Sequence, residues 1–200
     1  MQEAARPTTA LRRALDGCPA SRRPTVLDAF AAARRRFASG ERIDMQGLAD
    51  ELGVNRVTLY RWVGSREQLI TEVLWAATVK NFVWYRSQHT GGPRSAVALA
   101  SFVRDVNDHP GMRQLLRDEP ALALGLLTST SGEYQRRYLG LIRDLIAEDR
   151  AEGLVSQEIP LDDLAYTAAR ITESYIHTRV LIGEAPDARR AAVVLGVLLR

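Results

Sequence analysis

The helical spacing of apolar residues is the feature that most constrains how this chain can fold. From Thr25 onward, apolar residues recur every three or four positions, and no segment alternates apolar and polar residues long enough to predict a strand. One helix is expected to begin at Thr25 and to end at Gly40. Longer helices are expected at about 66–87, 94–107, 112–129, 133–152, 161–182 and 187–199. The pattern predicts an all-α protein.

Charge is distributed unevenly along the 200 residues, which are enough for a small domain joined to a larger one. The first 69 residues hold 12 Arg against 8 Asp and Glu, whereas the rest holds 15 Lys and Arg against 16. The basic excess therefore lies in the first third, as expected if that third faces a polyanion such as DNA. Residues 1–23 are expected to form a flexible basic arm, either a solvated tail or a segment whose Arg22 and Arg23 reach DNA.

Several function classes lack their sequence signals. The single cysteine, Cys18, excludes an internal disulfide framework and a Cys-based zinc cluster. The three histidines have no metal-ligand spacing, and we find no nucleophile elbow and no phosphate-binding glycine loop. Since no apolar run is long enough for a membrane span or a signal peptide, we expect a cytoplasmic protein. We expect no enzyme activity, no catalytic residues, no cofactor and no metal.

Residues 44–64 read as helix, tight turn and second helix. Asp44 can cap the first helix, Gly53 can take the left-handed conformation that ends it, and Asn55 can cap the second. The buried stripe of the first helix is expected to comprise Met45, Leu48, Ala49 and Leu52. This order of signals predicts a helix-turn-helix.

The second helix, about 56–63, has two different faces. Leu59 and Val63 point into the small core, while the opposite side carries Arg56, Val57, Tyr60 and Arg61. Arginine can bind guanine edges or phosphate, an apolar side chain can contact a thymine methyl, and a tyrosine hydroxyl can bind phosphate. We therefore interpret this helix as one that lies in the major groove. By contrast, the Arg34-Arg35-Arg36 run is interpreted as a solvated face.

These residues resemble a known family. The stretch from Leu48-Ala49 through Gly53-Val54-Asn55 to Ser65-Arg66-Glu67-Gln68-Leu69 is similar to the DNA-binding domain of the tetracycline-repressor (TetR) family, over about residues 24–70. The departures, Val63 for a common Phe and Arg66 for a common Lys, keep the apolar and the basic character. The resemblance implies an N-terminal three-helix DNA-binding domain at 24–70 and a helical effector-binding and dimerisation domain at 71–200.

Site residues follow from the resemblance, position by position. It implies phosphate contacts from Thr58, Tyr60 and Arg66, with a further one from Thr25. It implies base contacts from Arg56 and Val57, helped by Gln46, and the expected DNA-binding set also includes Asn55 and Arg61. Trp62 could contact phosphate through its indole N–H or pack at the domain edge.

The C-terminal two-thirds is expected to sense a small molecule and to form a homodimer on a near-palindromic operator in double-stranded DNA. The last two helices, 161–182 and 187–199, either pair with a second copy or complete the monomer core. The candidate pocket residues are aromatic or polar: Trp75, Trp84, Phe102, Arg104, Asn107, Tyr134, Tyr138, Tyr166, Tyr175 and His177.

The tract from His109 to Leu124 resembles a regulator subgroup linked to degradation of lactone quorum signals, which implies a lactone effector. A small molecule is expected to tilt the helix at 66–87 and release a repressor from DNA. The alternative is a helical small-molecule-binding or adaptor protein without DNA activity, which would leave Arg56, Val57 and Tyr60 without a role.

Overall fold

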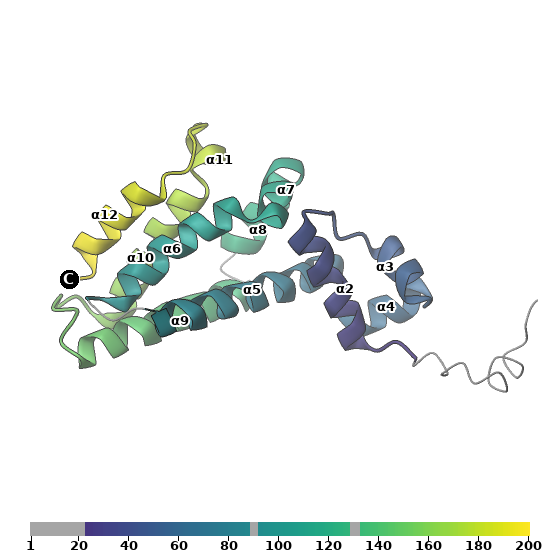
Figure 1. Ribbon diagram of the computed structural model, residues 1–200, viewed down its shortest axis with the longest axis horizontal. Coiled ribbons are helices and arrows are strands. Elements are labelled where there is room, and N and C mark those ends of the chain that lie inside the picture. The colour runs from purple at the N-terminus through teal and green to yellow at the C-terminus, as the bar shows by residue number, and fades with distance from the viewer. Residues whose placement is uncertain (1–22, 89–91, 129–132) are drawn as a thin grey trace, which may run out of the picture.

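The computed structural model describes residues 23–88, 92–128 and 133–200, and these residues form helices and no strand. The predicted all-α fold is confirmed. Nearly all of the predicted basic arm, with Cys18, and also His89 lie outside the described residues. In Figure 1, α2, α3 and α4 form one end of the molecule, and α5 runs from them along the C-terminal helices. None of the helices in the described part of the chain is both long and apolar enough to cross a membrane.

The N-terminal unit consists of α2 (Val26–Ser39), α3 (Met45–Leu52) and α4 (Arg56–Val63). Thr25 and Asp28 form the predicted capping box at the start of α2, and Gly40 ends the helix with a φ of 77°. The fully buried Leu48 and Leu59 join α3 and α4 to the core, each contributing about 1.5–3 kcal/mol by burial. Helical spacing predicts that Val26, Phe30, Ala33 and Phe37 form the inner stripe of α2. Ala33 and Phe37 are buried as predicted, but Val26 is 43% exposed, and Ala29 and Ala32 are buried as well.

The long helix α5 (Arg66–Gln88) joins this unit to the C-terminal helices. It packs against α6 (Arg94–Asp108) and α9 (Glu133–Ala151). Next to these lie α10 (Leu161–Ile176) and α12 (Ala188–Leu198), both of which contact α6. Their core is rich in aromatic rings, with Phe82 in contact with both Phe102 and Tyr138.

Two of the predicted helices are each divided into two. The expected helix at 112–129 is α7 (Pro110–Asp118) followed by α8 (Pro120–Thr128), because Pro120 has no N–H with which to continue α7. The expected helix at 161–182 ends at Ile176, and His177 separates it from the short α11 (Thr178–Ile182). The Thr178 hydroxyl donates to the carbonyls of Ser174 and Tyr175 at 3.1 and 3.0 Å, which closes the end of α10.

The N-terminal unit contacts the C-terminal helices closely where α2 meets α7. A Cβ placed on Gly111 would lie 2.1 Å from the carbonyl oxygen of Phe37, so only glycine fits at this point. The imidazole of His109 stacks on the Phe37 ring with a centroid distance of 4.7 Å, and its Nδ1 accepts the Gly111 N–H at 3.1 Å. The start of α7 therefore fixes the end of α2.

Candidate functional site

The turn between α3 and α4 is built by local hydrogen bonds. The Asp44 carboxylate accepts the Gly47 N–H at 2.7 Å, and the Asn55 side chain accepts the Val57 N–H at 2.8 Å. Between them, Gly53 has a φ of 63°, which reverses the chain. All three predicted signals are confirmed. Together they direct α4 across α3, with Leu59 buried beneath it.

The outward face of α4 is exposed and mixed in character. Val57 is 74% exposed and Tyr60 37% exposed, and both Arg56 and Arg61 lie at the surface. The Arg56 Nη2 donates to the Tyr60 hydroxyl at 3.2 Å, and its guanidinium lies 5.4 Å from the centre of the Tyr60 ring. This face therefore offers an exposed apolar side chain between oriented hydrogen-bond donors. Such a combination suits base edges and phosphates.

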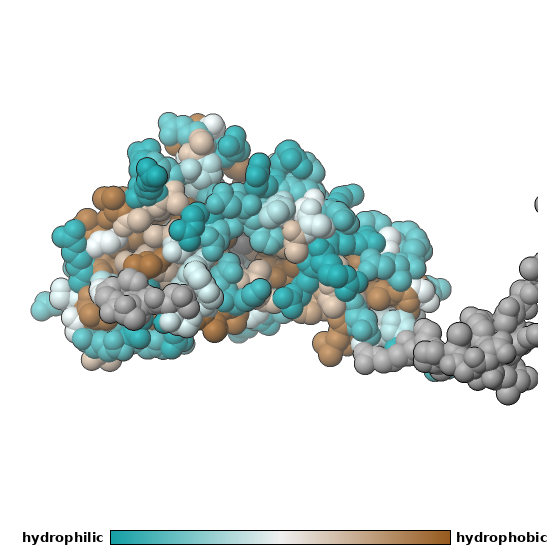
Figure 2. Space-filling model, in the orientation of Figure 1, coloured by the Kyte–Doolittle hydropathy of each residue, from teal (hydrophilic) through white to brown (hydrophobic). Residues whose placement is uncertain are grey.

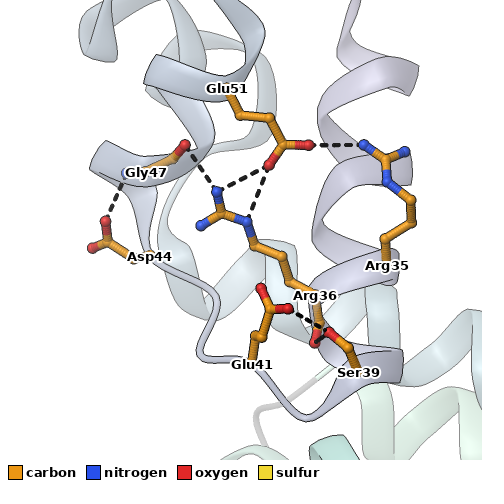
Figure 3. Close-up of polar contacts among 7 residues, drawn as sticks. All are labelled: Arg35, Arg36, Ser39, Glu41, Asp44, Gly47 and Glu51. Carbon is orange, nitrogen blue, oxygen red and sulfur yellow. Dashed lines mark hydrogen bonds and ion pairs between the residues drawn. The ribbon is translucent and has the colours of Figure 1, made fainter.

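The arginine run on α2 holds the helix-turn-helix in place. The Arg36 Nη2 donates to the Gly47 carbonyl at 3.0 Å and to the Glu51 carboxylate at 2.9 Å (Figure 3). The Arg35 Nη2 donates to the other Glu51 oxygen at 2.8 Å (Figure 3). The interpretation as a solvated face holds for Arg35, whose side chain is 67% exposed, and was wrong for Arg36, whose side chain is 21% exposed. These two arginines join α2 to α3, whose residues are 11 or more positions away in sequence, so local spacing carries no signal for them.

Other residues of the expected DNA-binding set have roles inside the fold. Asn55 caps α4, and the Thr25 hydroxyl donates to the Asp28 carboxylate at 2.6 Å. Gln46 is exposed and donates to Asp50 at 2.8 Å, while Thr58 is half-buried. Trp62 is half-buried and packs against the core, which supports packing at the domain edge rather than phosphate contact.

Arg66 is bound within the protein. Its two terminal nitrogens donate to the two oxygens of Glu119 at 2.7 Å each, and its Nε donates to the Ile43 carbonyl at 2.5 Å. The side chains of Arg66 and Glu119 are only 16% and 18% exposed. These contacts use three of the five N–H groups of the guanidinium, and the expected phosphate contact from Arg66 stays a prediction.

Glu119 is a residue that sequence reasoning missed. It lies between α7 and α8 and also accepts the Arg42 Nε at 3.1 Å. The hydrogen bonds from Arg66 lower its pKa from 4.5 to about 2 against the opposing effect of burial, and Arg42 adds a smaller effect. Since 53 residues separate it from Arg66, no local pattern marks the pair.

The second feature is a narrow cavity, partly open to solvent, in which the centre of a water-sized sphere can move through about 40 Å³. Its wall comes from α2, α5, α6, α7, α9 and α10, with His109 and His177 from helix junctions. Four predicted pocket residues line it: Phe102, Tyr134, Tyr138 and His177. The wall also contains residues that were not predicted, among them Phe37, Asp105, His109 and Glu173.

The remaining predicted pocket residues do not line this cavity. Trp84 and Tyr166 are each 55% exposed, and Arg104 lies in a shallow groove between α6 and α12. Asn107 donates to its own helix at the Val103 carbonyl, 2.8 Å away. Trp75 and Tyr175 are half-buried in the core, Trp75 with its ring edge-on to Tyr134. Helical spacing alone does not distinguish a cavity wall from the core or the outer surface.

An apolar surface covers the outer side of α12. Val193 is 68% exposed, Val197 54% and Val194 39%, whereas Ala191 and Leu195 on the other side are buried against the core. Figure 2 shows hydrophobic residues gathered at the end of the molecule that α12 occupies in Figure 1. The helix therefore completes the monomer core with one face and leaves the other exposed.

Residues 90–200 match the family model described as the tetracyclin repressor-like C-terminal domain. The chain belongs to the TetR family. It is a DNA-binding transcriptional regulator that responds to a small molecule, and the prediction from the sequence is confirmed at this level.

Solved structures of the family share the fold. The transcriptional repressor QsdR of R. erythropolis has 26% sequence identity and a TM-score of 0.75, with 87% of this chain and 93% of that chain covered. The repressor AlkX from Dietzia sp. strain DQ12-45-1b has 21% identity, a TM-score of 0.57, and coverage of 89% and 97%. FadR from Bacillus subtilis, in complex with stearoyl-CoA, has 14% identity, a TM-score of 0.53, and coverage of 86% and 97%. No curated protein sequence matches the chain.

Proposed function

We propose that this protein is a homodimeric repressor that reads a near-palindromic DNA site with α4 and leaves it when a small molecule occupies the cavity. The observation that carries the proposal is the outward face of α4, where the 74% exposed Val57 lies among arginines and a tyrosine. The proposed division is a DNA-binding domain at 24–70 and an effector-binding and dimerisation domain at 71–200. The protein would act on chromosomal DNA in the cytoplasm, without a catalytic step.

On DNA, each residue of the α4 face would make its own contact. Arg56 and Val57 would contact base edges in the major groove, with Gln46 of α3 beside them. Tyr60, Thr58 and Arg61 would bind phosphates, and Thr25 would do so at the start of α2. Asn55 would act indirectly, by capping the helix that carries these residues.

The dimer would form through the exposed apolar faces of the C-terminal helices. The exposed Val193, Val194 and Val197 give α12 an apolar strip that a second copy can cover, and Tyr166 on α10 is exposed as well. A two-fold arrangement of four helices would place the two α4 helices roughly 34–36 Å apart, one DNA turn. The symmetry of the protein would then match that of the operator.

The effector would act where the cavity meets the DNA-binding domain. Phe37 of α2 and His109 both line the cavity and stack on each other, so a ligand there can move the end of α2. Helix α5 lines the cavity with Leu74 and Thr78 and carries Arg66 at its DNA end. A ligand with different affinities for the two conformations would shift the DNA-binding equilibrium. We propose a lactone as the effector, consistent with the sequence resemblance at 109–124.

Fluorescence anisotropy on duplex DNA from upstream of the protein's own gene tests the DNA-binding part. Tyr60→Phe and Arg56→Ala should weaken binding by about tenfold, since each removes a contact that costs about 1–3 kcal/mol when lost. Arg117→Ala is the matched control, because this arginine is 72% exposed on α7 and should leave affinity unchanged. Weak binding equal to that of a scrambled duplex, indifferent to all three substitutions, would favour the adaptor alternative.

A further inference from the structure

Two buried polar side chains on the cavity wall lack hydrogen-bond partners. Tyr138 is 1% exposed and His177 is 3% exposed. Within the described residues, no hydrogen bond of normal geometry reaches the Tyr138 hydroxyl or either ring nitrogen of His177. The Thr172 hydroxyl lies near that of Tyr138 and lowers its pKa slightly against the effect of burial, but it donates its own proton to the Ala168 carbonyl. Buried polar groups in folded proteins are nearly always paired, because an unpaired one costs about 1–3 kcal/mol. Both groups line the same cavity, so a bound molecule could supply the missing partners.

The neighbouring Tyr134 differs from Tyr138 because its hydroxyl has a hydrogen-bond partner. It lies one helical turn before Tyr138, and the two rings stack with centroids 6.0 Å apart. Its hydroxyl, however, is hydrogen-bonded to the Thr78 hydroxyl at 2.9 Å. The cavity wall therefore gives the Tyr134 hydroxyl a partner of normal geometry and gives the Tyr138 hydroxyl none.

The charges around the cavity restrict which molecules can enter. None of the described lining residues is Lys or Arg, and the two acidic ones are Asp105 and Glu173. Each acidic side chain already has an arginine outside the lining set: Arg170 lies 2.9 Å from Glu173, and Arg104 lies 3.1 Å from Asp105. An anionic head group would find no counter-charge, and a cationic one would compete with an existing ion pair.

The histidines do not change this conclusion. Burial lowers the pKa of both His109 and His177 below the usual value of 6.5, so both rings are neutral at pH 7. A neutral imidazole presents one donor and one acceptor. Tyr138 and His177 can thus donate to an uncharged oxygen, while His177 can also accept a hydrogen bond.

We propose that the cavity selects an uncharged molecule with an apolar body and a carbonyl oxygen, which Tyr138 and His177 bind through hydrogen bonds. The body would pack on Phe102, Leu74 and Ile176, which are apolar parts of the wall. This selection of ligands rests on the proposed function only for its effect on DNA binding. Binding of the molecule itself does not depend on it. An ester, a lactone or an amide has the required chemistry.

Isothermal titration calorimetry without DNA tests the charge selection with three probes of equal chain length: methyl octanoate, octanoate and octylamine. At pH 7.5 the ester should bind, and the anion and the cation should each bind at least about tenfold more weakly. Equal or tighter binding of octanoate or octylamine would overturn the proposal, as would the absence of ester binding. Since DNA is absent, a failure of DNA binding would not affect this result.

Substitutions test the two polar groups. Tyr138→Phe removes a hydroxyl that has no partner, so the Tm of the free protein should stay the same or rise, while ester affinity falls by about tenfold. His177→Phe should also weaken ester binding. Ser95→Ala on α6 is the control, because Ser95 does not line the cavity: breaking its buried hydrogen bond to Asp149 should lower the Tm but keep ester affinity within about twofold. If ordered water satisfies Tyr138 and His177, neither substitution will change ester affinity, and the proposal fails.

Discussion

At the scale of single residues, Glu119 makes the main polar contact between the DNA-binding and C-terminal parts of the chain. It accepts hydrogen bonds from Arg66 at the start of α5 and from Arg42 between α2 and α3. The bidentate contact with the Arg66 guanidinium, at 2.7 Å for both bonds, fixes direction as well as distance. The junction between α7 and α8 is therefore attached to the base of the DNA-binding domain.

Replacement of Glu119 by Gln should lower the free energy of unfolding by about 1–3 kcal/mol at pH 7, because it removes the charge that pairs with a mostly buried arginine. Asp118→Asn is the matched control. This neighbour is 46% exposed and bonded to Arg117, so its loss should cost less than about 1 kcal/mol. Chemical denaturation of both variants measures the difference.

The effect of Glu119 should depend on pH. Its pKa is about 2 in the folded protein and 4.5 without its partners, so its contribution is complete above pH 4.5 and is lost as the pH falls towards 2. The stability difference between the wild type and Glu119→Gln should narrow over that interval. A difference that stays constant across it, or an equal loss in Asp118→Asn, would show that the ionised carboxylate is not the cause.

At the scale of helices, the close approach of α2 and α7 determines how the two parts of the molecule fit together. Gly111 allows the first turn of α7 to lie against the Phe37 carbonyl, and the Phe37 ring stacks on His109 above it. Because Phe37 and His109 also line the cavity, this contact lies between the proposed ligand and the DNA-binding domain. Any displacement of α7 would be transmitted to the end of α2.

Gly111→Ala should destabilise the protein by about 1–3 kcal/mol, because its Cβ would meet the Phe37 carbonyl at 2.1 Å and force the helices apart. Gly140→Ala on α9 provides the control. No atom would lie within 4 Å of its Cβ, so it should stabilise the helix by about 0.5–1 kcal/mol. Thermal unfolding of the two variants should give shifts of opposite sign. A neutral Gly111→Ala would mean that α2 and α7 can separate at no cost.

Local signals account for what the sequence could predict about these helices. The capping boxes of Thr25 with Asp28 and of Ser65 with Gln68 span only three residues, so their spacing alone identifies the helix starts. The break at His177 has no Gly or Pro to mark it. It follows from the side-chain bond of Thr178 to the backbone, which many threonines could make.

The cavity was only partly predictable for a different reason. Tyr138 and Trp84 are both aromatic residues on long helices, yet Tyr138 is 1% exposed and Trp84 55% exposed. Their difference depends on which helices pack beside them, and that packing brings together residues far apart in sequence. Ion pairs such as Arg66 with Glu119 also depend on the packing of helices that are far apart in sequence. Sequence patterns therefore predict the helix-turn-helix and the exposed face of α4 better than they predict the cavity and the contacts between distant helices.

At the scale of the whole molecule, the chain combines an exposed α4 face, a cavity lined by α2 and by C-terminal helices, and an apolar strip on α12. One α4 of eight residues covers only a short stretch of DNA, so a single subunit would read little sequence. The strip around Val193 and Val197 provides a means to pair two subunits. Recognition of a longer DNA site therefore requires a two-fold symmetric dimer on a two-fold symmetric sequence.

Selection of binding sites from random duplex DNA tests this requirement most directly. The wild type should enrich a near-palindromic sequence whose half-sites are about one helical turn apart, roughly 34–36 Å. The double variant Val193→Glu Val197→Glu, which places charges in the proposed interface, should enrich no such site. Val83→Glu is the control, because Val83 is 61% exposed on α5, away from both α4 and α12, and its replacement should leave the enriched site unchanged. Enrichment of a single unpaired half-site, or of no sequence by the wild type, would contradict the account.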